Sequence, residues 1–312
     1  MIPKMNIQKM IISVFYELKP IIPRPMQIWL RRIITSAKRK RHAEIWPILK
    51  TAVKQPQGWS GWPDGKKFAL VLTHDVDTAR GHERCYHLME LEEQLGFRSA
   101  FNFVPERYSV SDNLRNKLTK HGFEVCVHGL NHDGKLFRSR KIFKERCVKI
   151  NHYLRIWNAV GFRAPAMHHN LEWIHDLNIQ YDMSTFDVDP FEPQSEGVST
   201  IFPFWMANNS NDHGYVELPY TLPQDFTLFI LLREKTINIW KYKLDWIAQH
   251  SGMALLNTHP DYMNFNNDLL APEEYYAHNY KKFLLYIKNN YNGEYWHALP
   301  KDMSRFWFTN MI

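Results

Sequence analysis

The chain has 312 residues, of which 45% are hydrophobic and 23% are charged, a composition that allows a sizeable core and excludes bulk disorder. Its three cysteines, Cys85, Cys126 and Cys147, form no close pair, which argues against a disulfide framework and a cysteine zinc site. The formal net charge of +7 is uneven: residues 1–42 hold ten Lys and Arg and one acid, a charge of +9 that leaves −2 for the remainder. We expect reduced thiols in a cytoplasmic protein.

Residues 1–53 are expected to form a basic helical N-terminal extension. Its apolar runs are interrupted by charges and prolines, so none reaches the roughly 20 apolar residues of a spanning helix, and no signal-peptide cleavage site is evident. The mix of apolar and basic residues over 1–42 is typical of a segment that contacts an anionic membrane surface peripherally. The alternative is a helical arm packed on the body with its basic face in solvent. No nucleic-acid-binding motif accompanies the charge, so no nucleic acid partner is expected.

Residues 54–67, rich in Gly, Pro and Trp, are expected to be a linker into a main domain at 68–312. In that domain, the expected strands are 68–73, 98–103, 123–127, 160–163, 179–184, 215–220 and 253–258. The segments with helical spacing are 82–95, 112–120, 138–157, 170–177, 236–250 and 273–290. This alternation predicts an α/β fold with a mostly parallel sheet, and seven strands favour a closed or nearly closed barrel. Residues 185–214 lack periodicity and are expected to be a long excursion.

Ionisable side chains follow four of the predicted strands directly. They are Asp75 and Asp77, His128 and His132, Arg163, and His259. Because the carboxyl ends of parallel strands share one face, and that face holds the active site in such folds, we expect these residues to meet there.

The two pairs suggest metal chemistry. Asp75 and Asp77 are two residues apart, and carboxylates this close repel unless a cation lies near them or one takes up a proton; the alternative is a turn that uses Asp for local hydrogen bonds. One helical turn would bring His128 and His132 onto one face, a usual spacing for chelation, although with 16 histidines such spacings also arise by chance. Two histidines and one carboxylate leave ligand positions open for water, as in a catalytic metal site.

Three further charged residues accompany these pairs. Arg163, at a strand end, needs an anionic partner, for which Asp75 is a reasonable choice. His259, before Pro260, lies where a proton donor could face the site. Glu217, inside an apolar run, has no assigned role.

Four short motifs follow one another over residues 66–262. THDVD is similar to a T-F-D-D motif with one residue inserted, HGLNHD matches H-[ST]-x-x-H-P at its histidines, RAPA matches R-x-P-[YFW] at Arg and Pro, and LNTHP matches L-x-x-H-P. In combination and order they resemble the polysaccharide deacetylases of the NodB homology type, carbohydrate esterase family 4. The resemblance implies a distorted (β/α)₇ barrel of the NodB type.

Several positions depart from the family pattern. Gly129 replaces a hydroxyl residue, Asp133 replaces proline, and Ala166 replaces an aromatic residue. The fourth motif, an Asp with a nearby Trp, remains open between Asp187 and Asp189. These departures leave the metal chemistry possible and count against a standard chitin-like substrate groove.

The resemblance also implies a mechanism with a divalent metal ion, for which Zn²⁺ is expected. The implied site residues are the metal ligands Asp77, His128 and His132, the catalytic Asp75, Arg163 and His259, and Ala166, whose N–H would help stabilise the oxyanion. Asp75 would take a proton as water attacks an N-acetyl carbonyl, Arg163 would keep Asp75 ionised, and His259 would protonate the leaving amine.

The implied reaction is removal of N-acetyl groups from an amino-sugar glycan or a sugar–lipid precursor. The alternatives are hydrolysis of another non-peptide C–N amide bond, or a degenerate member that binds glycans without cutting them. Since the residues implied for base, ligands and acid are all present, the sequence favours an active enzyme. We expect it to be cytoplasmic, with a peripheral position at the inner membrane face as a further option.

Overall fold

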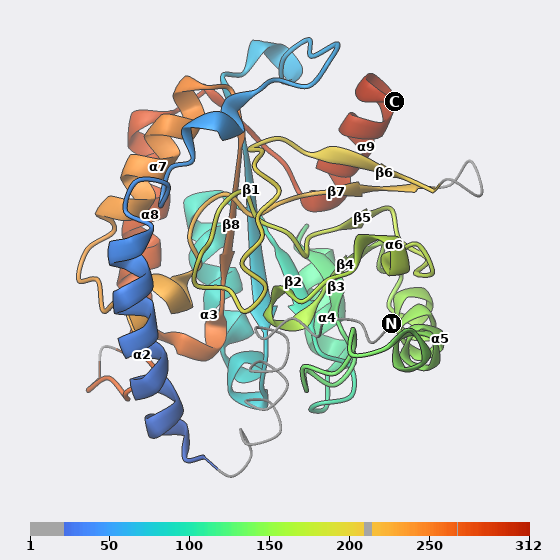
Figure 1. Cartoon of the computed structure of the whole chain (residues 1–312), viewed down its shortest axis with the longest axis vertical. Helices are drawn as coiled ribbons and strands as arrows, with labels where there is room; N and C mark the ends of the chain where they lie inside the picture. The colour runs from blue at the N-terminus through green and yellow to red at the C-terminus, as the bar shows by residue number, and fades with distance from the viewer. Residues whose placement is uncertain (1–21, 209–213, 267) are drawn as a thin grey trace, which may run out of the picture.

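A computed structural model describes residues 22–208, 214–266 and 268–312 (Figure 1). Seven parallel strands form its centre: β1 (Phe68–Val76), β2 (Ala100–Phe103), β3 (Glu124–His128), β4 (Gly161–Arg163), β5 (Tyr181–Asp182), β7 (Gly214–Glu217) and β8 (Met253–Thr258). Each strand pairs with the next one along this list except β7 and β8, and β8 pairs with β1. The run 68–76 is buried throughout, as expected for a central strand covered on both faces.

The remaining gap in the sheet, between β7 and β8, is bridged by the chain that follows β7. Leu222 forms a parallel bridge with Leu256, and the N–H groups of Thr221 and Leu222 both donate to the Leu255 carbonyl. The sheet therefore curls into a nearly closed, distorted (β/α)₇ barrel, which confirms the predicted fold class and all seven predicted strands.

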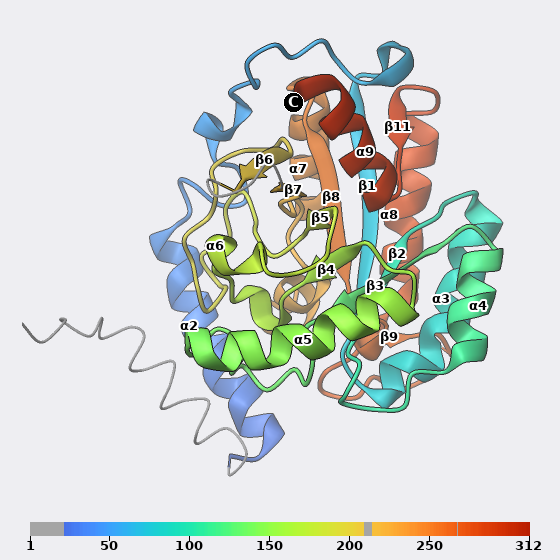
Figure 2. The ribbon, with the colours of Figure 1, turned by 90° about the vertical axis from the view of Figure 1, so that its right-hand side faces the viewer.

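Helices cover the outside of the barrel, as Figure 2 shows for α3, α4 and α5. The crossover and C-terminal helices are α3 (Ala79–Leu95), α4 (Asp112–Lys120), α5 (Arg140–Ile156), α6 (Leu171–Ile174), α7 (Asn238–Gln249), α8 (Ala277–Asn290) and α9 (Pro300–Met311). Thr78, Ser111 and Ser139 precede α3, α4 and α5, and their hydroxyls accept hydrogen bonds from first-turn N–H groups. These caps explain why the helices begin where they do. The helix predicted over 170–177 is only one turn long.

Several elements are absent from the sequence-based prediction. They are α9 and the short strands β6 (Phe204–Ala207), β9 (Met263–Asn264), β10 (Tyr275–Tyr276) and β11 (Tyr295–His297). β6 lies within the predicted excursion and pairs with β7 in antiparallel orientation, while β11 extends the sheet beside the start of β1. Strands of two to four residues carry too little periodicity to be recognised without their partners.

The segment before β1 is packed against the barrel. Trp62 is 4% exposed, and its ring lies 4.6 Å from that of Trp59 and 6.4 Å from that of Trp307 in α9. Residues 54–67, expected as a linker, thus contribute to the aromatic core. The division of the chain into an extension, a linker and a main domain stays a prediction.

The helix α2 (Arg24–Arg41) lies along the side of the barrel, at the left edge of Figure 1. It contacts the π-helical turn Phe226–Leu231, which lies between β7 and α7 in the chain. Within the parts of the chain that the structure describes, no helix is long and apolar enough to cross a membrane. Residues 1–21 of the predicted extension lie outside the described residues.

Candidate active site

The register of the barrel strands brings the predicted polar residues together at the carboxyl ends of the strands. Asp75 on β1 lies opposite Asn102 on β2, and His128 on β3 lies opposite Arg163 on β4. His259 follows the last residue of β8. All these side chains are buried, so they form one polar cluster enclosed by the barrel wall.

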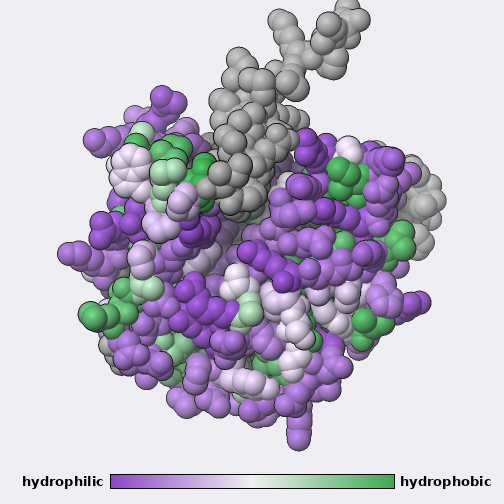
Figure 3. Space-filling model, turned by 90° about the horizontal axis from the view of Figure 1, so that it is seen from below, coloured by the Kyte–Doolittle hydropathy of each residue, from purple (hydrophilic) through white to green (hydrophobic). Residues whose placement is uncertain are grey.

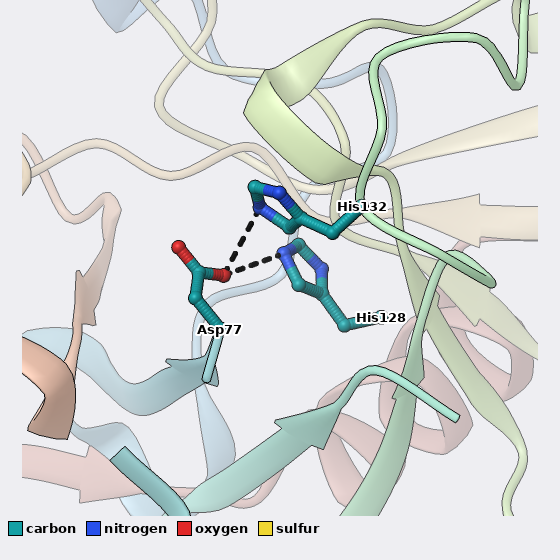
Figure 4. A group of neighbouring side chains, drawn as sticks. All are labelled: Asp77, His128 and His132. Atoms are coloured by element: carbon teal, nitrogen blue, oxygen red, sulfur yellow. Dashed lines mark ion pairs between the residues drawn. The ribbon is translucent and has the colours of Figure 1, made fainter. Parts of the chain in front are cut away.

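Three side chains form a candidate metal centre. The Oδ1 atom of Asp77 lies 3.4 Å from Nε2 of His128 and 3.1 Å from Nε2 of His132, and the three ligand atoms all lie within 4.8 Å of one another. Figure 4 shows both imidazoles pointing toward the carboxylate. The predicted ligand set is therefore assembled in space.

The protonation pattern of this cluster fits a bound cation. The buried Oδ1 atom of Asp77 accepts no hydrogen bond. The Nδ1 atom of His128 lies 3.0 Å from the Arg163 carbonyl, and because a carbonyl only accepts, Nδ1–H must donate. In the neutral imidazole, Nε2 then turns a lone pair toward the carboxylate. Lone pairs that face one another are stabilised by a cation between them, and two nitrogens with one oxygen suit Zn²⁺ or a similar divalent ion.

The loop that carries the two histidines differs from the expected helical turn. Gly129 and His132 have φ angles of 59° and 54°, in the left-handed region, so the chain folds back as a loop after β3. The ring centroids of His128 and His132 still come within 5.3 Å of each other. The expectation of chelation is compatible with this loop, whereas the helical geometry predicted for it is wrong.

Two departures from the family pattern have local structural explanations. A Cβ atom on Gly129 would lie 2.5 Å from both Cγ and Cδ of Pro165, so a hydroxyl residue does not fit there. Asp133 accepts two hydrogen bonds of 2.7 Å from Arg146 on α5, which fastens the end of the histidine loop to that helix.

Asp75 is held as an ionised carboxylate. Asn102 donates to its Oδ1 at 2.7 Å, Asn257 donates to its Oδ2 at 2.8 Å, and the Arg163 guanidinium lies 3.1 Å from Oδ1. Burial alone would raise the pKa of Asp75. In the metal-free cluster, where His128 can carry a proton, the charges of His128, Arg163 and His259 outweigh burial and hold that pKa below its usual value. The predicted pairing of Arg163 with Asp75 is confirmed.

The Arg163 guanidinium is held in place by hydrogen bonds to three groups besides Asp75. Its Nε donates to the Met183 carbonyl at 2.9 Å, and its Nη1 also donates to Thr73 Oγ1 at 2.9 Å and Asn257 Oδ1 at 2.7 Å. The side chain is fully buried, so these partners replace part of the water that a guanidinium would otherwise bind, while its Nη2 has no hydrogen-bond partner among the described residues.

His259 lies on the opposite side of Asp75 from Arg163. Its Nε2 is 4.0 Å from Asp75 Oδ2, and its Nδ1 is 2.7 Å from Oδ1 of Asp225. Asp225 also accepts hydrogen bonds from the His259 backbone N–H and the Tyr275 hydroxyl. Burial would lower the pKa of His259, but Asp225 raises it to about 10, so the imidazole is protonated at neutral pH.

Asp225, like Asn102 and Asn257, is a site residue that the sequence analysis missed. Asp187 pairs with Lys243 and Asp189 accepts a hydrogen bond from the Tyr220 hydroxyl, so neither of the two residues left open for the fourth motif bonds to His259. The choice between them stays open. The available signal was position: Asp225 closely follows the predicted strand 215–220, as the other polar site residues follow theirs.

The other expected positions are outside the metal cluster. Ala166 lies in the turn Pro165–Met167 after β4 with a φ of 53°, and its oxyanion role stays a prediction. Glu217, left without a role, ends β7 and accepts hydrogen bonds from the N–H and hydroxyl of Thr185.

Comparison with known proteins supports the fold. The sequence matches no protein-family model, and no curated protein is significantly similar to it. A solved structure described as a putative polysaccharide deacetylase from Mycobacterium smegmatis is similar with a TM-score of 0.60 and 18% identity, over 82% of this chain and 95% of that one. The PuuE allantoinase is similar with a TM-score of 0.58 and 14% identity, over 83% of this chain and 95% of that one. A probable polysaccharide deacetylase from Pseudomonas aeruginosa PAO1 has the same TM-score and identity, over 80% of this chain and 94% of that one. The chain thus has the NodB-type polysaccharide deacetylase fold.

Replacing Gly129 by Ala should destabilise the protein by about 1–3 kcal/mol, because the new Cβ collides with Pro165 in addition to the cost of a positive φ. Gly65→Ala is the matched control, since its φ of 66° is similar and no atom lies within 4 Å of the added Cβ. Denaturant unfolding of both variants measures the difference. Equal losses of stability would mean that the Pro165 contact does not constrain the loop.

Replacing Asp225 by Asn should lower the pKa of His259 by about one unit or more, because the largest of the charges that oppose the effect of burial is removed. The imidazolium would lose its proton at a lower pH. An NMR titration of the His259 ring measures this, with Tyr275→Phe as a control that removes one hydrogen bond and no charge. An unchanged pKa in Asp225→Asn would contradict the role assigned to Asp225.

The purified protein should contain close to one divalent metal ion per chain, and His128→Ala should lose it, because two ligands remain of three. Elemental analysis of both proteins tests this after reconstitution with Zn²⁺. His152→Ala, which changes an exposed histidine on α5, should keep the metal. Metal-free wild-type protein after reconstitution would rule out the metal centre.

Proposed function

We propose that the protein is a metal-dependent hydrolase that removes N-acetyl groups from an amino sugar in a glycan or a sugar–lipid. One observation carries this proposal: an ionised carboxylate, Asp75, lies between a three-ligand metal centre and a protonated imidazole, His259. A base, an electrophile site and an acid at one point are the groups that amide hydrolysis requires.

In this proposal each side chain has one task. Asp77, His128 and His132 would hold the divalent ion, which would lower the pKa of bound water and polarise an amide carbonyl. Asp75 is a weak base because its pKa is low, and it accepts the proton of the attacking water. Arg163, Asn102 and Asn257 keep its two oxygens in place.

The second proton transfer falls to His259. Its Asp225 partner keeps the imidazole protonated at neutral pH, and its Nε2–H is the free donor that faces Asp75 across the site. Donation to the departing nitrogen lets it leave as a neutral amine and not as an amide anion, so that the C–N bond can break. The products are acetate and a free amino sugar, so one amide C–N bond breaks for each water consumed.

A second candidate is the hydrolysis of another non-peptide C–N amide bond by the same groups. The similarity of the fold to the PuuE allantoinase favours keeping this option, as does Ala166, where the deacetylases carry an aromatic residue. A member that only binds glycans is disfavoured, because loss of activity would be expected to remove the base or a ligand, and both are present.

Replacing Asp75 by Asn should reduce turnover by about 10²–10⁴-fold and leave the metal bound, because the amide cannot take a proton and is not a ligand. Acetate release from N-acetylated oligosaccharides and ring opening of allantoin are the assays that separate the two candidate reactions. Asp77→Asn is the matched control, which should lose metal and activity together. Full activity in Asp75→Asn would mean that another group is the base.

A further inference from the structure

The helix α2 packs on the barrel with its polar side. Its guanidinium and ammonium groups bind the body: Arg24 forms a salt bridge of 2.8 Å with Glu273, and Arg39 forms one of 2.7 Å with Glu234. Arg32 donates to the Ile230 carbonyl at 2.8 Å, and Lys38 donates to the Pro190 carbonyl at 2.6 Å. The expected arm packed on the body is therefore present, but much of its basic face contacts the barrel and is not simply in solvent.

The apolar side of α2 faces outward. The exposed residues Met26 (46%), Trp29 (58%), Leu30 (36%), Ile33 (50%) and Ile34 (55%) follow the i, i+3, i+4, i+7, i+8 spacing of a single helix face. We call these five residues the α2 stripe. In a helix of a globular protein this stripe would normally be the buried one, and contiguous exposed apolar surface of this kind marks an interaction site.

A loop beside α2 adds further exposed apolar side chains. Leu269 is 97% exposed and Leu270 is 40% exposed, in the segment between β9 and β10. The same segment is fastened to α2, because Glu273 pairs with Arg24 and the Pro272 carbonyl accepts from Arg32 Nη2 at 3.1 Å. Figure 3 shows that the end of the molecule seen from below is otherwise mostly hydrophilic, with apolar groups gathered in a few patches.

The positive charge around the stripe indicates which kind of partner can bind there. α2 carries seven Lys and Arg and no acid, and Lys40 and Arg41 at its carboxyl end are exposed. A second copy of the chain would bring this cationic helix against itself. Residues 1–21, which precede α2 in the chain, contain three lysines and one glutamate and are also net positive. An anionic bilayer offers an apolar layer for the stripe and phosphate groups for the cations.

The helix that carries the stripe is connected to the candidate active site through a short series of ring contacts. The Arg31 guanidinium lies 4.7 Å from the Phe226 ring centroid, the Phe226 ring lies 4.9 Å from that of Tyr262, and the Tyr262 ring lies 5.3 Å from that of His259. In Figure 1, the amino end of α2 and the carboxyl ends of β1 and β8 point to the same end of the molecule. A surface bound at the amino end of α2 therefore lies at the same end of the molecule as the catalytic groups.

We propose that the α2 stripe, with Leu269 and Leu270, docks the protein on an anionic membrane surface. The helix lies in the interface, with the stripe among the acyl chains and the exposed Lys40 and Arg41 at the level of the headgroups. Resting on the proposed function, this position assigns the substrate to N-acyl sugars carried on a lipid, presented from the bilayer to the adjacent site.

Binding of the full-length protein to vesicles tests the docking directly. We expect it to co-sediment with vesicles of phosphatidylcholine and phosphatidylglycerol, and to bind pure phosphatidylcholine vesicles at least about tenfold more weakly. The double variant Trp29→Glu/Ile33→Glu should lose about tenfold or more in affinity for the anionic vesicles. Since both side chains are already exposed, the variant should fold normally. Val148→Glu is the matched control, because Val148 is 71% exposed on α5, outside the stripe, and its replacement should leave binding unchanged.

Each contrary result overturns the docking proposal. Equal vesicle binding by the wild type and the double variant would exclude the stripe. A wild-type dimer that becomes monomeric in the double variant, measured by light scattering, would assign the stripe to a second copy. Binding that appears only after deletion of residues 2–21 would mean that this segment covers the stripe in the full chain.

The substrate assignment has a separate readout. With the metal centre intact, the double variant should hydrolyse a short soluble N-acetylated substrate at the wild-type rate and a lipid-linked one in vesicles at least about tenfold more slowly. Equal loss on both substrates would reject the assignment. Vesicle binding without any hydrolysis by wild-type protein would refute the proposed function and leave the docking intact.

Discussion

The buried pair of Arg163 and Asp75 is the interaction on which the rest of the site depends. Two charges removed from water are costly unless their remaining hydrogen-bonding groups find partners. Those partners come from the barrel strands themselves, with Asn102 on β2 and Asn257 on β8 binding the carboxylate. A shift of one residue in any of these strands would turn its polar group away from the pair. The polar network and the strand register therefore stabilise one another.

The same constraint divides the site electrostatically. Asp75 is surrounded by positive groups and by amide donors, which keep it negative, while His259 is bound by Asp225, which keeps it positive. Burial alone would favour the neutral form of both groups. A carboxylate base and an imidazolium acid can therefore coexist 4.0 Å apart because each has its own fixed partner on the side away from the other. Amide hydrolysis needs both charge states, since the negative Asp75 accepts a proton from water and the positive His259 donates one to the departing nitrogen.

The helix α2 differs from the crossover helices in which of its faces contacts the barrel. The crossover helices bury their apolar faces on the sheet, whereas α2 uses its arginines and lysine on carboxylates and carbonyls of the barrel and leaves its apolar stripe outside. Polar anchoring holds the helix beside the site without using its apolar surface. That surface remains available for binding, which links the position of the catalytic groups to the surface on which the protein would act.

The sequence by itself determined the seven barrel strands, most of the crossover helices and six of the polar residues that meet at the site, because apolar runs and the residues at their ends are local features. It did not determine β6, β11 or α9, or the partner of His259, since Asp225 is recognised only when β8 and the turn after Tyr220 come together. The closeness of Pro165, which leaves no room for a side chain at Gly129, is likewise visible only in the folded chain. The amphipathic pattern of residues 24–41 predicts two faces, but only the tertiary structure decided which one is covered, because the acids and carbonyls that bind its cations lie elsewhere along the chain.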